Sequence, residues 1–135
     1  MAGFTFRYRL SGGAPTIQRF IFQDTETLTK GDMVSIETGV ADLAATADAV
    51  LAGVALQTKA GTTTVSTIDI ITDADAVYGV TDANARLQGA TLDIAGATGA
   101  QTVAASNNAE FLVVAGSSAT EETLVTFNVA KHWLT

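Results

Sequence analysis

Short runs of alternating apolar and polar residues, separated by glycine-containing turns, recur along this chain. In the run at 33–37, Val34 and Ile36 fall on one face and the other residues on the opposite face, which is the period of a half-buried strand. Turn signals recur about every 8–15 residues, and no strand–helix–strand rhythm is present. The pattern predicts a mainly β fold: a compact antiparallel β-sandwich or small β-barrel with an extended N-terminal arm and at most one or two short helices.

Several segments are predicted in more detail. The expected strands are 4–10, 16–23, 33–37, 50–56, 65–71, 77–80, 91–95, 102–104, 110–116 and 123–134. Gly53, in the middle of an apolar strand, indicates a bulge or a close backbone approach. The segment 40–49 fits a short helix or a loop equally well, and 82–88 fits one helical turn capped by Asp82.

Charge is distributed unevenly between the start of the chain and the rest. The first 23 residues contain Arg7, Arg9 and Arg19 and no carboxylate, whereas the 14 acidic residues all lie at or after Asp24. Charge separation of this kind steers association and fixes register more than it sets affinity. The basic part also begins with an aromatic strand, which is typical of a docking element.

Two interpretations of that first strand remain open. In one, residues 1–15 form an N-terminal arm on a single β-rich domain at 16–135, and the arm adds to the sheet edge of a partner. The body would then fold without residues 1–10. In the other, the segment is an edge strand whose solvated arginines discourage aggregation. For the arm, alternation places aromatic and basic side chains on opposite faces, and the expected contact residues are Phe4, Phe6, Arg7, Tyr8 and Arg9.

Composition excludes several classes of protein. The chain has 135 residues, enough for one domain with one core. It contains no cysteine, so disulfides, thiolate metal sites and a cysteine nucleophile are excluded. A pI near 4.3 argues against nucleic acid as a partner. No signal peptide is visible, and Asp42 and Asp48 interrupt the longest apolar stretch, so no membrane association is expected.

No signature of catalysis, of metal binding or of a cofactor emerges from the residues. His132, the sole histidine, lies beside Trp133 and is expected to pack on the last strand, because no nucleophile or carboxylate partner is evident. The closely spaced carboxylates Asp69, Asp73 and Asp75 lack the glycine and trailing glutamate of a calcium loop, so we expect a solvated loop. Asp93 is expected to point outward from its strand. We therefore expect no enzyme and no catalytic, metal-binding or cofactor-binding residue.

Two stretches resemble structural proteins of tailed phages. The segment 31–56 contains a Gly-Asp-x-Val turn and strand, a polar loop and a Gly-Val-Ala strand. The segment 82–134 contains Asp-Ala-Asn-Ala and Gly-Ala-x-Leu-Asp-Ile, followed by a terminal alternating strand. The combination resembles the capsid decoration (cement) protein family. These motifs are structural turns and strands, so no family site residues carry over.

The resemblance implies a virion protein on the outer capsid surface, made in the host cytoplasm, that binds the major capsid protein. It implies a homotrimer that stabilises the capsid by bridging major capsid protein subunits. The main alternative is another virion surface β-module, such as a tail, fibre or glycan-binding piece. A glycan-binding module is disfavoured because the chain has one Trp and two Tyr, and these are scattered.

Overall fold

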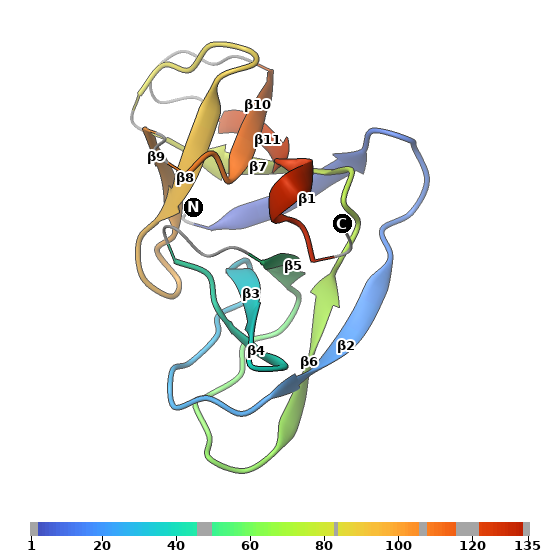
Figure 1. Ribbon diagram of the computed structural model, residues 1–135, viewed down its shortest axis with the longest axis vertical. Coiled ribbons are helices and arrows are strands. Elements are labelled where there is room, and N and C mark those ends of the chain that lie inside the picture. The colour runs from blue at the N-terminus through green and yellow to red at the C-terminus, as the bar shows by residue number, and fades with distance from the viewer. Residues whose placement is uncertain (1–2, 46–49, 83, 106–107, 116–121, 134–135) are drawn as a thin grey trace.

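Two antiparallel β-sheets form the fold, one above the other in Figure 1. The computed structural model describes residues 3–45, 50–82, 84–105, 108–115 and 122–133. Within those residues there are eleven strands, and the only helix is the short 3₁₀ helix η1 at Val129–Lys131. The mainly β prediction is confirmed, and the arrangement is that of a β-sandwich rather than a closed barrel.

The larger sheet has six strands in the order β1-β7-β11-β10-β8-β9. Their bounds are β1 Phe4–Arg9, β7 Ala76–Thr81, β8 Thr91–Ala95, β9 Thr102–Ala105, β10 Phe111–Ala115 and β11 Glu122–Phe127. All the pairings are antiparallel. The first strand of the chain is therefore an edge strand, and it pairs with β7 from the middle of the sequence.

The smaller sheet has five strands in the order β2-β6-β5-β3-β4. Their bounds are β2 Ile17–Phe22, β3 Met33–Glu37, β4 Val40–Leu43, β5 Leu51–Ala55 and β6 Ser66–Ile71. This sheet is curled, because its two edge strands β2 and β4 lie close together without pairing. The larger sheet curls as well, since the amide of Gly3, just before β1, donates to the carbonyl of Gln101, just before β9, at 2.9 Å.

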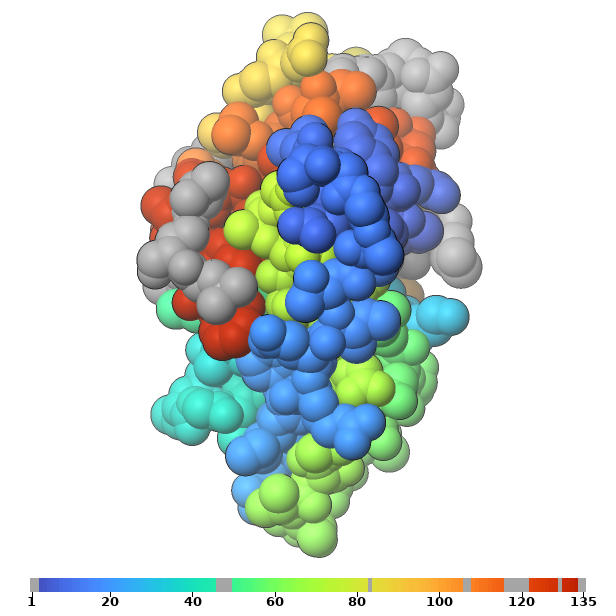
Figure 2. Space-filling view, turned by 90° about the vertical axis from the view of Figure 1, so that its right-hand side faces the viewer, coloured from blue at the N-terminus to red at the C-terminus, as the bar shows by residue number. Residues whose placement is uncertain are grey.

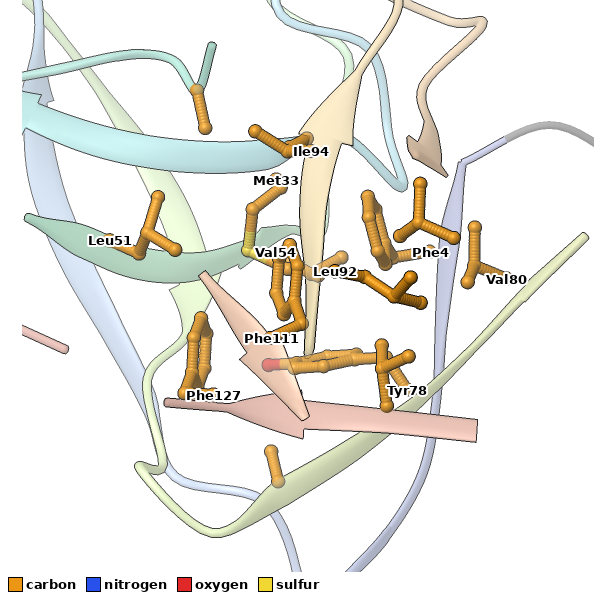
Figure 3. Packing of buried hydrophobic residues seen from close by; sticks show 14 of the residues in the cluster. Phe4, Met33, Leu51, Val54, Tyr78, Val80, Leu92, Ile94, Phe111 and Phe127 are labelled. Carbon is orange, nitrogen blue, oxygen red and sulfur yellow. The ribbon is translucent and has the colours of Figure 1, made fainter. Parts of the chain in front are cut away.

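The main core lies between the two sheets (Figure 3). Aromatic rings from four strands of the larger sheet meet there, with Phe4 at 5.4 Å from Phe111 and Tyr78 at 5.9 Å from Phe127 between ring centroids. The smaller sheet contributes aliphatic side chains such as Met33. Burial of this apolar surface is the main stabilising contribution to the sandwich.

A second core fills the concave side of the curled smaller sheet. Its fully buried members are Phe22, Leu28, Val34, Ala41, Ala52, Ala55, Ile68 and Ile70. Trp133 packs over this core with its ring 5.1 Å from that of Phe20. Strand β5 is consequently buried on both faces, which explains why its sequence is an unbroken apolar run rather than an alternating one.

Gly53 allows β5 to serve both cores. A Cβ on Gly53 would lie 1.6 Å from the carbonyl oxygen of Ile71, and its φ is +153°. The register of β5 against β3 shifts at this point, so Leu51 and Val54 both reach the main core. Both parts of the prediction for Gly53, a bulge and a close approach, are confirmed.

Several local predictions are corrected. Residues 40–43 form strand β4, because they pair with β3 across the turn at Thr38 and Gly39; residues 46–49 lie outside the described part. The described residues of 82–88 form no helical turn, although the Asp82 carboxylate does accept a hydrogen bond from the Asn84 amide at 3.2 Å. The last strand, expected at 123–134, ends at Phe127, and the 3₁₀ helix η1 follows it at Val129–Lys131.

Candidate interaction surface

The three arginines of the basic N-terminal segment are bound to carboxylates of the same chain. Arg7 donates through Nε to Glu122 Oε1 at 2.8 Å, and Arg19 donates to Asp69 at 3.0 Å. Arg9 lies 3.0 Å from Asp75 and 3.5 Å from Asp73. The uneven charge of the sequence therefore serves, at least in part, to hold the first strands on the body.

The loop between β1 and β2 is fixed by the same acidic residues. Asp75 accepts hydrogen bonds from the amide and hydroxyl of Ser11, and Asp73 accepts one from the Thr16 amide at 2.6 Å. Burial alone would raise the pKa of the Asp75 carboxyl, but the bonds from Ser11 and Arg9 outweigh it and lower the pKa to about 2. The expectation of a solvated loop at Asp69, Asp73 and Asp75 is therefore wrong.

Residues 4–9 form a sheet strand rather than an extended arm. Phe4 is 2% exposed, and it packs edge-on against Tyr78 with the ring centroids 6.5 Å apart. Phe6 also packs against Tyr78, at 6.2 Å. Because both side chains belong to the core, the interpretation as an edge strand describes this segment better than the interpretation as an arm.

A β-bulge separates Tyr8 from the other two aromatic residues. The register against β7 shifts between Phe6 and Tyr8, which places Tyr8 opposite Val77. The expected single face of Phe4, Phe6 and Tyr8 is thus broken, because the extra residue reverses the alternation. Tyr8 is 43% exposed. Which of the five expected contact residues touch a partner stays a prediction, and Phe4 is not available for contact in this fold.

Exposed apolar side chains follow the same N-terminal segment. Figure 2 shows β1, the loop and β2 (blue) running down one face of the molecule. We call the N-terminal strip its four large exposed apolar side chains, Tyr8, Leu10, Ile17 and Ile21, of which Leu10 and Ile17 are more than half exposed. Large exposed apolar side chains that gather along one segment are a candidate interaction site.

The remaining candidate residues are structural. His132 is 3% exposed and lies 4.9 Å from the Phe127 ring; burial lowers its pKa. It packs against the last strand as expected. Asp93, expected to point outward, is instead 2% exposed and accepts a hydrogen bond from the Asn108 amide at 3.0 Å. Across the residues that the structure describes, no group of His, Asp and Glu side chains is placed to hold a metal ion.

Three carboxylates come together where the end of β2 meets the β3–β4 hairpin. Burial of Asp42, together with hydrogen bonds and charge repulsion from Glu37 and Asp24, raises its pKa to about 7. No local sequence pattern marks this cluster, since the three residues meet only through the curl of the sheet. No helix in the described part of the chain has the length and apolar character needed to cross a bilayer.

The fold defined by these two curled sheets has a counterpart among phage head proteins. The structure is similar to the crystal structure of the N base of head fibre gp8.5 in bacteriophage phi29, with a TM-score of 0.54. The match has 12% sequence identity and covers 86% of this chain and 98% of that chain. No protein-family model matches the sequence. No curated protein matches it either.

Proposed function

We propose that this chain is a structural protein of a phage virion that sits on the outer surface of the head. The observation that carries the proposal is the similarity in fold to a head-fibre base over nearly the whole of both chains. The turn and strand motifs at 31–56 and 82–134, which resemble those of phage capsid decoration proteins, support the same assignment independently. A role in catalysis is not proposed, since the buried His132 and the paired aspartates have structural partners.

In this proposal the protein binds the major capsid protein through the N-terminal strip. The strip offers exposed apolar side chains on a segment whose backbone and charges are fixed by Glu122, Asp75 and Asp69. A prearranged surface of this kind loses little conformational entropy on binding. As a homotrimer bridging capsid subunits it would stabilise the head, because a ligand that binds only the assembled shell opposes its dissociation.

A head-fibre base is the second candidate, favoured by the similarity in fold to the N base of the phi29 head fibre. A cement protein and a fibre base differ in their effect on the shell. If this chain bridges capsid subunits, its binding should raise the temperature at which heads disrupt. If it is a fibre base that attaches without bridging subunits, we expect no such rise. Heating heads with and without bound protein therefore separates the two.

The test of head binding is co-sedimentation of the purified chain with heads that lack it, from the virus that encodes it. We expect saturable binding that the double variant Leu10→Glu and Ile17→Glu reduces at least tenfold, because each carboxylate would be desolvated at the interface. Leu87→Glu is the matched control, since Leu87 is 81% exposed and lies outside the strip. Absence of binding by the parent chain would refute the proposal. Equal loss of head binding in both variants would refute the strip as the contact surface.

A further inference from the structure

An apolar groove runs alongside the free edge of β1, where this strand passes β5. It has a volume of about 400 Å³ and is lined mainly by apolar groups, among them the side chains of Phe6, Val54, Leu56 and Ile71. Gly31 and Lys30 border it as well. The groove lies where the two sheets meet, so most of its lining comes from strand residues that pack on the main core, and the turn at Lys30 and Gly31 borders it.

The edge of β1 already makes one backbone hydrogen bond beside this groove, to the turn at Lys30 and Gly31. The amide of Phe4 donates to the carbonyl of Gly31 at 2.8 Å, on the side of β1 that faces away from β7. Residues 4–6 are in regular register with β7, and backbone groups two residues apart in a strand point to the same side. The amide and carbonyl of Phe6 therefore face the free edge too, one position further along, where the groove opens.

Charge at the rim selects the occupant. Each arginine in the described residues has a carboxylate partner within the chain, whereas the structure records no ion pair for the exposed Lys30. The chain as a whole has a net charge of −7, so Lys30 is a local positive site on an acidic protein. A carboxylate placed beside it would gain a charge-assisted contact that the rest of the surface opposes.

We propose that this groove binds an extended segment of a partner protein that adds to β1 as a further strand. The segment has apolar side chains at alternate positions, which enter the groove, and an acidic residue that reaches Lys30. Its backbone hydrogen-bonds to the amide and carbonyl of Phe6, one position beyond the bond between Phe4 and Gly31. This inference is independent of the proposed function, because it concerns a surface that the N-terminal strip does not include.

The test begins with an mRNA-displayed library of random octapeptides selected on the full chain. We expect enrichment of peptides with alternating apolar residues and one Asp or Glu. The best peptide should broaden or shift the amide resonances of Thr5, Phe6 and Leu56. Lys30→Glu should weaken its binding at least tenfold, and replacing the peptide's acid by Lys should restore binding to that variant.

Two controls make the result decisive. N-methylation of the peptide at alternate amides removes strand pairing but keeps the side chains, so it should abolish binding. Lys131→Glu changes a lysine that lies in η1 and should leave binding unchanged. The proposal is overturned if no peptide is enriched, if the N-methylated peptide binds equally well, or if both lysine variants weaken binding alike.

Discussion

Arg9 illustrates how single residues attach the basic segment to the acidic body. Its guanidinium is partly buried and lies between Asp73 and Asp75, whereas the pair of Arg7 and Glu122 is largely exposed. An exposed pair of this kind contributes little to stability because water screens it. The pairs therefore define where β1 and β2 lie more than they stabilise the fold.

Gly53→Ala is expected to destabilise the protein severely. The added Cβ would lie 1.6 Å from the Ile71 carbonyl oxygen, so the contact between β5 and β6 must open. Gly12→Ala is the control, since Gly12 also has a positive φ, of +80°, but has no atom within 4 Å of its added Cβ. It should cost about 1 kcal/mol. Urea unfolding of both variants checks this, and similar midpoints would contradict the close approach at Gly53.

Asp42→Asn is expected to stabilise the protein at pH 8 but not at pH 3, which lies below both pKa values of Asp42. The pKa of Asp42 is raised from 3.8 to about 7, so between these values the folded state holds a proton that the unfolded state releases. Stability is therefore lost progressively as the pH rises from about 4 to about 7. Removing the charge should restore roughly 1 kcal/mol at pH 8, allowing for solvent screening. A variant less stable than the parent at pH 8 would contradict the raised pKa of Asp42 in this cluster.

Asp75→Asn should show the opposite dependence on pH. The pKa of Asp75 is lowered to about 2, so its contribution is present above its ordinary value near 4 and is lost as pH falls through 2. The variant should be less stable than the parent by about 1 kcal/mol at pH 7 and equal to it near pH 2. Thermal melts at both pH values measure this, and a constant difference would show that the charge is not responsible.

At the level of the strands, β1 is part of the core. Phe4→Ala should cost about 3–5 kcal/mol, because it removes a ring that is 2% exposed between Tyr78 and Phe111. Tyr8 lies in the same strand but is 43% exposed. Tyr8→Ala should therefore cost less than about 1 kcal/mol. Chemical denaturation compares them. If Phe4→Ala were as mild as Tyr8→Ala, β1 would be a detachable arm after all, and the body would fold without residues 1–10.

Local pattern predicted most strands and the special role of Gly53, because alternation and a glycine inside an apolar run are visible in a few residues. The bulge after Phe6 was not predictable, since no glycine or turn residue marks it. The carboxylate partners of the arginines could not be predicted from the sequence either. Arg7 and Glu122 lie 115 residues apart, and only the strand order brings them together. Of the five expected contact residues, only Tyr8 belongs to the N-terminal strip, because the exposure of each side chain depends on the bulge and on the strand order.

Across the whole molecule, the two curled sheets share one core and leave distinct surfaces on either side of β1. One is the N-terminal strip, with its exposed apolar side chains on β1, the loop and β2. The other is the groove between β1 and β5. Two surfaces on one rigid body suit a protein that joins other molecules, which is the role we propose for it on a phage head.

Cryo-electron microscopy of heads incubated with the purified chain tests that role most directly. We expect added density at regular positions on the outside of the shell, into which the two-sheet body fits with residues 8–21 towards the capsid. Heads that remain bare at saturating protein, or density in which these residues face solvent, would contradict it.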